Sequence, residues 1–199
     1  MGDAPVDVVR HWMAVLLVIG YPPGVLYWYA VHPFAERWRR LGPAVSLAIL
    51  LPALVGAVLA GLAVRASLIG ADLGFTWATV LPGLLLYGLG LGVERRCRRQ
   101  LRLRVLAGVP ELSQARPGRL LTEGIYGRVR HPRYVAVLLT TTGWALVANH
   151  TGAYVLSLAA SLALFGVVGL EERELADRFG HAWTEYARRV PRFVPRPGH

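Results

Sequence analysis

Two clusters of charged residues, each at the end of a hydrophobic stretch, have the composition of a ligand site. In the segment GIYGRVRHPRY, residues 124–134, Arg130, His131 and Pro132 stand directly before one hydrophobic stretch. The pair Glu171-Glu172 ends the next one. An arginine binds carboxylate or phosphate groups well, and adjacent carboxylates attract cations. The two clusters together would suit a ligand that carries both charges.

The first cluster has the features of a helix entrance that binds an anion. Pro132 is placed like a proline at the first helical position, where its missing N–H costs nothing. His131 would then be the cap, and the amides of Arg133 and Tyr134 would be free at the helix start. With Arg130 and the helix dipole they would attract a carboxylate or a phosphate equally well. The alternative is that both arginines only mark the membrane interface and that His131 is only a cap.

The elements that must position these clusters are membrane helices. The chain has 199 residues, is 54% hydrophobic and only 17% charged, and has a mean hydropathy of +0.42. A span needs roughly 20 apolar residues, and backbone groups in lipid must be satisfied within the helix. We therefore expect an all-α, polytopic membrane protein. Its five predicted spans are Val8–Val31, Ala44–Val64, Phe75–Val93, Tyr134–Asn149 and Gly152–Leu170.

The fourth predicted span is short and should form a tight helical hairpin with the fifth. The start of one span then lies beside the end of the other, which brings Arg130 and His131 close to Glu171 and Glu172. Carboxylates near a membrane are costly and tend to be functional. An anion site beside a cation site favours a zwitterion, such as the amino-acid end of S-adenosylmethionine, over a dinucleotide phosphate. The alternative is an Arg–Glu pair that only locks the hairpin.

The arginines predict the topology. All 22 basic residues are arginine, and all but Arg10 and Arg65 fall in the first loop, between Arg95 and Arg133, or after the last span. By the positive-inside rule the amino terminus lies outside and the carboxyl terminus in the cytoplasm. The net charge of +10 is then explained by topology and anionic lipid headgroups rather than by nucleic acid. Exclusive use of arginine suggests a GC-rich genome, hence a bacterial cell membrane.

We expect a single membrane domain, 1–199, in three parts. Residues 1–93 form a three-helix scaffold, 94–132 a basic cytoplasmic loop that begins the ligand motif, and 133–199 the catalytic hairpin and a tail. In the tail, Glu171–Tyr186 predicts an amphipathic helix, because apolar residues recur at spacings of three and four. That helix would be either a cytoplasmic lid or a surface helix on the bilayer. One cysteine and six scattered histidines predict no metal site.

The runs LLTEGIYGRVRHPRY and EERELADRFGHAWTEYARRVPRFVP, separated by the hairpin, resemble a known superfamily. This is the isoprenylcysteine carboxyl methyltransferase and phospholipid methyltransferase superfamily. Its signature is G-x-Y-x-x-x-R-H-P-x-Y, then E-E-x-x-L-x-x-x-F-G-x-x-[YW]-x-x-Y and a V-P-x-x-x-P-like segment. The resemblance covers about Gly118 to Pro195. The first three spans match only as hydrophobic helices.

The resemblance implies an S-adenosylmethionine site enclosed by the last two spans, the preceding loop and the tail. The implied catalytic residues are Arg130, His131 and Glu172; Glu172 would support Glu171, and Glu172 or His131 could accept a proton. The implied cofactor-binding residues are Gly118, Arg119, Leu120, Leu121, Gly124, Tyr126, His131, Pro132, Arg133, Tyr134 and Glu171. Two positions depart from the family. The family often has a histidine at the position of Gly118. Val167 stands where the prenylcysteine enzymes have an arginine that faces the substrate carboxylate.

The implied function is methyl transfer from S-adenosylmethionine to a lipophilic acceptor that enters from the bilayer, while the cofactor enters from the cytoplasm. Val167 argues against prenylcysteine itself as the acceptor. One alternative is an NADPH-dependent membrane reductase of the sterol type, which resembles the same region. Another is a non-catalytic membrane protein that binds lipid or a partner. The identity of the acceptor and the oligomeric state stay open.

Overall fold

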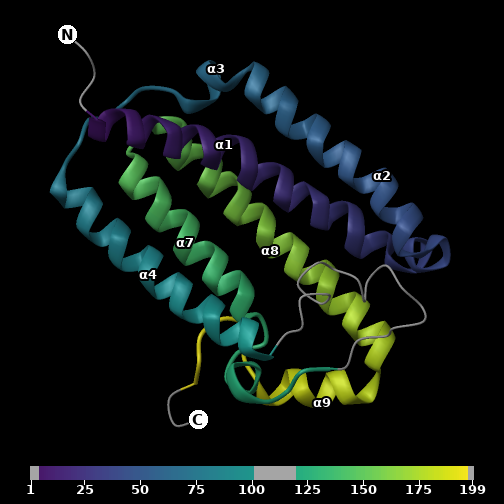
Figure 1. The fold of residues 1–199 in the computed structure, drawn as a ribbon. Helices are drawn as coiled ribbons and strands as arrows, with labels where there is room; N and C mark the ends of the chain where they lie inside the picture. Colours follow the sequence, from purple (N-terminus) through teal and green to yellow (C-terminus); the bar gives the residue numbers. More distant parts are fainter. Residues whose placement is uncertain (1–4, 101–119, 197–199) are drawn as a thin grey trace.

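The computed structural model describes residues 5–100 and 120–196 and is helical throughout this part of the chain (Figure 1). The all-helical prediction is thus confirmed for these residues. Besides the helices there is one isolated bridge, between Asp72 and His150. The elements in chain order are α1 (Pro5–Val31), η1 (His32–Phe34), α2 (Ala35–Ala63), α3 (Arg65–Ile69), α4 (Trp77–Gln100), η2 (Gly124–Gly127), α7 (Pro132–Ala148), α8 (Thr151–Phe179) and α9 (His181–Arg189).

Three described stretches are long and apolar enough to cross a membrane: Pro5–Ala63, Trp77–Gln100 and Thr151–Phe179. The first comprises α1 and α2, which run in opposite directions after the short η1 (Figure 1). Helix α7, with 17 residues, is shorter than these stretches. The structure therefore supports a membrane protein with several apolar helices. Five spans and an external amino terminus stay predictions.

Glycines fix α7 directly against α4. A Cβ atom added at Gly83 would lie 2.8 Å from the carbonyl oxygen of Gly143, and one added at Gly143 would lie 2.5 Å from that of Gly83. About two turns further along α4, a Cβ atom added at Gly90 would lie 2.6 Å from the side-chain methyl group of Thr140. Small residues let two membrane helices approach to backbone contact. Helix α4, predicted as part of a general scaffold, therefore sets the position of the helix that begins the site.

The turn between α7 and α8 is tied to α1 at the opposite end from the site. Asn149 ends α7 in the left-handed conformation, with φ of 50°, and its side chain donates to the carbonyl of Gly74 over 2.8 Å. Arg10 is almost completely buried and pairs with Asp72 and, over 2.7 Å, with Asp7. These contacts hold α1, the segment before α4 and the hairpin turn together.

The tail differs from the predicted single helix over Glu171–Tyr186. Helix α8 continues without interruption through the Glu pair to Phe179. The helix ends at Gly180, whose φ is 54°, and the short amphipathic helix α9 follows. A positive φ favours glycine because it has no Cβ atom. Trp183 and Tyr186 of α9 pack with Val190 and Leu120 into a small apolar cluster, and α9 lies across the end of the helices (Figure 1).

The glycine contacts predict a local sensitivity on α4. In Gly83→Ala the new methyl group would overlap backbone atoms of α7 that cannot move aside, and overpacking of this kind costs about 1–3 kcal/mol. We expect a lower melting temperature in detergent by circular dichroism. Gly88→Ala on the same helix is the control, because an added Cβ there meets nothing within 4 Å. Equal melting temperatures for the two variants would contradict the close packing of α4 on α7.

Candidate functional site

His131 stands at the start of α7, and its side chain turns toward the two carboxylates. Helix α7 begins at Pro132, so His131 is the cap residue, but its side chain makes no capping hydrogen bond. Its Nε2 atom lies 3.1 Å from Glu172 Oε1, and its Nδ1 atom lies 3.6 Å from Glu171 Oε2. Only 4% of His131 is exposed. The structure thus places one imidazole between the two carboxylates.

Glu172 is surrounded by cationic partners. Besides His131, the Nη2 atom of Arg130 lies 3.0 Å from Glu172 Oε1. Arg192 donates from Nε to Glu172 Oε2 over 3.0 Å and from Nη2 to the same oxygen over 2.5 Å. Such charge-assisted hydrogen bonds are stronger than neutral ones. Glu172 is therefore held in place by α7 on one side and by the tail on the other.

Arg192 was not among the residues predicted from the sequence. It belongs to the segment after α9, in which prolines and arginines alternate with apolar residues. The amides of Arg130 and His131 donate to the carbonyls of Pro191 and Arg192 over 2.8 and 3.1 Å. Arg130 also donates from Nη1 to the carbonyl of Ala187 over 2.9 Å, and its guanidinium lies over the ring of Trp183. The tail is therefore an integral wall of the site.

Glu171 has unused hydrogen-bonding capacity. Its Oε2 atom is buried and makes no close hydrogen bond among the described residues, and its nearest cationic group is His131 Nδ1 at 3.6 Å. A buried carboxylate oxygen without a donor is costly, and a cation would satisfy it. The amide of Arg133, in the first turn of α7, has no carbonyl partner within that helix. One carboxylate and one helix start are thus available to a ligand.

A second polar cluster follows one turn further along α8. The Nδ1 atom of His32, at the end of α1, lies 2.8 Å from Glu174 Oε2, and Arg39 also pairs with Glu174. The His32 ring stacks on Trp28 at 5.3 Å between centroids. The sequence analysis treated this half of the chain as scaffold and missed His32. The signal that could have found it is Glu174, which follows Glu171 by three residues and so lies near the same face of the helix.

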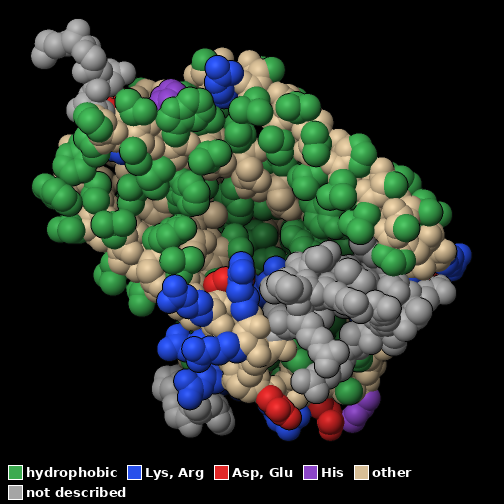
Figure 2. Space-filling model, viewed as in Figure 1, with side chains coloured by type: hydrophobic (Ala, Val, Ile, Leu, Met, Phe, Trp, Pro, Cys, Tyr) green, Lys and Arg blue, Asp and Glu red, His purple; other side chains and the backbone are tan. Residues whose placement is uncertain are grey.

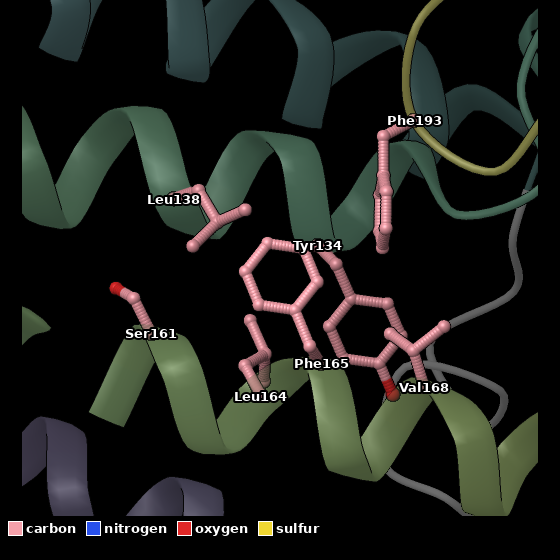
Figure 3. Close-up of a pocket in the computed structure, with 7 residues that line it drawn as sticks. All are labelled: Tyr134, Leu138, Ser161, Leu164, Phe165, Val168 and Phe193. Carbon is pink, nitrogen blue, oxygen red and sulfur yellow. The ribbon is translucent and has the colours of Figure 1, made fainter. Parts of the chain in front are cut away.

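A narrow apolar crevice lies between α7 and α8 beside the charged cluster (Figure 3). Tyr134 and Phe165 point into it from the two helices, and Phe193 reaches it from the tail. The rings of Phe165 and Phe193 meet edge to face at 5.3 Å, and Phe193 lies 6.0 Å from the His131 ring. The remaining lining residues are Leu138, Ser161, Leu164 and Val168. The crevice is therefore apolar and, in this structure, too narrow to hold a small molecule.

The other predicted site residues have different surroundings. Leu121 and Tyr126 pack against Cys97 of α4, and Leu120 joins the cluster around Trp183. Gly124 adopts φ of 59°, and an added Cβ would overlap the side chain of Gln100. Gly118 and Arg119 lie outside the described residues. Val167 is completely buried and packs with Val25, Ala160 and Leu164.

The two carboxylates change the protonation of His131. Burial alone would lower the pKa of this imidazole, but hydrogen bonds and charges from Glu171 and Glu172 outweigh burial and raise its pKa above 6.5. The protonated ring donates from both nitrogens. The two carboxylates thus favour the protonated form of this imidazole.

Long apolar helices, a histidine between two carboxylates and a covering basic tail indicate a membrane protein with an enclosed polar site. The phospholipid methyltransferase family matches residues 78–182, which extend from α4 through the Glu pair into α9. The chain therefore belongs to this family of membrane methyltransferases. It matches no solved structure.

Its curated relatives have several activities. A Delta(14)-sterol reductase of Mus musculus is 32% identical over 45% of this chain and 22% of its own length. Methanethiol S-methyltransferase 1 of Bradyrhizobium diazoefficiens is 32% identical over 41% of this chain and 28% of its own. Protein-S-isoprenylcysteine O-methyltransferase B of Arabidopsis thaliana is 33% identical over 39% of this chain and 40% of its own length. The chain thus spans well under half the length of each of these relatives.

The raised pKa of His131 predicts a pH dependence of stability. A histidine whose pKa is higher in the folded state stabilises that state fully below its unfolded pKa, near 6.5, and loses this contribution as pH rises through the folded pKa. We expect the melting temperature to fall as pH rises above 6.5. The variant His131→Gln should be less stable at pH 6 and should lose most of this slope. A wild-type slope that persists unchanged in the variant would contradict the assignment to His131.

Proposed function

We propose that this protein transfers a methyl group from S-adenosylmethionine to a lipophilic acceptor within the membrane. The observation that carries the proposal is His131 clamped between Glu171 and Glu172, where α7 begins and α8 passes. Membership of a membrane methyltransferase family supports the reaction class. We place the site on the cytoplasmic side of a bacterial membrane, because the arginines gather at that end of the chain.

The residues present fit the amino-acid end of the cofactor. An ammonium group would satisfy the unpartnered Oε2 atom of Glu171. The start of α7 at Arg133 would hold a carboxylate. Arg130 and Arg192 pair with Glu172, whereas Glu171 has only the more distant His131 nearby, so Glu171 is the carboxylate that can attract a further cation. The ligand supported by this arrangement is a zwitterion rather than a doubly charged phosphate.

S-adenosylmethionine supplies a methyl group on a sulfonium, which passes to the acceptor by in-line displacement. The residues of this chain bind and orient the reactants and exclude water. The carboxylates favour the protonated form of His131, which has no lone pair to accept a proton, and Glu172 is paired with Arg130 and Arg192. Both therefore act as positioning residues in this proposal. The arrangement favours an acceptor that reacts without a general base, such as a thiolate or a carboxylate.

The acceptor side of the site is apolar. The crevice between α7 and α8 is lined by apolar side chains beside the charged cluster (Figure 3). It is too narrow to hold a small molecule in this structure, so in this proposal a lipophilic acceptor from the bilayer enters by displacing these side chains. Val167 lies in the packed core, so no cation at this position is available for an acceptor carboxylate. This supports an acceptor other than prenylcysteine. In this proposal the tail acts as a lid, because Arg192 and Phe193 close the site from the cytoplasm.

A reductase is the second candidate, and the Mus musculus relative is the observation that favours it. Such an enzyme would use NADPH. The unpartnered Glu171 oxygen would repel the phosphates of that cofactor, whereas it would attract an ammonium group. A non-catalytic protein of the same fold is the third candidate, and it would bind neither cofactor.

Cofactor titration of the purified protein separates these candidates. We expect S-adenosylmethionine to bind by isothermal calorimetry and NADPH not to bind. Glu171→Gln should weaken binding roughly 10- to 100-fold, because a hydrogen bond to a charged group is worth about 1.5–3 kcal/mol. Glu185→Gln on the exposed side of α9 is the matched control and should bind like the wild type.

Binding of NADPH alone would overturn the proposal in favour of a reductase. Binding of neither cofactor would favour the non-catalytic alternative. Incubation with labelled S-adenosylmethionine and a host lipid extract, followed by mass spectrometry, would then identify the methylated acceptor.

A further inference from the structure

A second, larger cavity lies on the other side of α7 from the charged site. It has a volume of about 410 Å³ and is bounded by α1, α4 and α7. These helices share the face shown in Figure 2, which is hollowed near its middle among hydrophobic side chains, with arginines gathered toward its lower end. Arg133 lines this cavity, whereas the next residue, Tyr134, lines the crevice beside α8. Helix α7 therefore separates the groove from the carboxylate pair.

The walls of the groove are apolar because their polar atoms are satisfied internally. The hydroxyls of Thr140 and Thr141 donate to carbonyls of α7, at 2.8 Å to Ala136 and 2.7 Å to Val137. The indole N–H of Trp144 donates to the carbonyl of Met13 over 2.9 Å, and the hydroxyl of Tyr21 lies 3.2 Å from that of Ser161. The groove thus presents methyl groups, ring faces and leucines, and it suits a hydrocarbon chain.

One end of the groove is charged and has a positive excess. Glu94 and Arg98 pair on α4 over 2.8 Å. Arg133 makes no ion pair among the described residues and lines the same end. The three charges leave one net positive charge, which favours an anionic group at this end.

The length of the groove corresponds to one leaflet of a bilayer. Along α7 it extends from Arg133 to Trp144, or roughly 16 Å at about 1.5 Å per residue. Half of the hydrocarbon core of a bilayer is about 15 Å. An acyl chain in the groove would thus place its headgroup beside Arg133 and Arg98 at the membrane surface.

We propose that the α1/α4/α7 groove binds one acyl chain of an anionic phospholipid, with its phosphate held by Arg133 and Arg98. The site is distinct from the transfer site and does not depend on the proposed function. The bound lipid fills the groove between α1 and α4 and so supports the face of α7 that is not packed against α8.

The test uses the full-length protein incubated with vesicles of equal parts phosphatidylglycerol and phosphatidylcholine, followed by native mass spectrometry of retained lipid. We expect about tenfold more phosphatidylglycerol than phosphatidylcholine on the wild type. Gly20→Leu should lose most of this retention, because Gly20 lines the groove and has open space where a side chain would project. Gly56→Leu on α2, where the space is also open, is the matched control.

Arg98→Gln tests the charge separately from the groove. Arg98 is exposed, so its replacement should not disturb folding, and the charges of Glu94 and Arg133 would then cancel. We expect the preference for phosphatidylglycerol to fall to about one to one. Equal retention of the two lipids by the wild type would overturn the proposal. Equal phosphatidylglycerol retention by Gly20→Leu and Gly56→Leu would also overturn it.

Discussion

The charge balance of Glu171 and Glu172 is the constraint on which the site end of the molecule depends. Two adjacent carboxylates at the end of an apolar helix are costly unless cations surround them. The chain supplies these cations as three residues from two separate segments: His131 and Arg130 before α7, and Arg192 in the tail. Because each segment must reach the same carboxylates, their ion pairs also fix how the tail packs against the hairpin.

His131 reaches the two carboxylates only if α7 is correctly positioned along its axis relative to α8. Contacts far from the site fix this position. Gly83 and Gly143 bring α4 and α7 to backbone contact, and Asn149 anchors the hairpin turn to the segment before α4. A small shift of α7 along its axis would separate His131 from the carboxylates. The amino-terminal half therefore positions the site, and through His32 and Glu174 it also contributes a polar cluster one turn away.

The residues that the sequence could predict are those with local signals. Pro132 predicts the start of α7, and the short turn after α7 predicts that Arg130 and His131 meet Glu171 and Glu172, as the structure shows. The break at Gly180 was harder to place, because the amphipathic pattern runs across it. Arg192 and His32 could not be assigned to the site from the sequence, since their roles depend on how the tail and α1 fold back onto α8. The glycine contacts of α4 could not be predicted either, because they depend on which residues of α7 lie opposite these glycines.

The two faces of α7 have opposite chemical character, and this follows from its first residues. Tyr134 points toward α8 and the carboxylates, while Arg133 points toward α4. Successive residues of a helix are rotated by about 100°, so Arg133 and Tyr134 face different neighbours. Pro132 favours the start of α7 at this position because its fixed φ suits the first helical residue. The same proline therefore aligns the carboxylate site on one face and the lipid groove on the other.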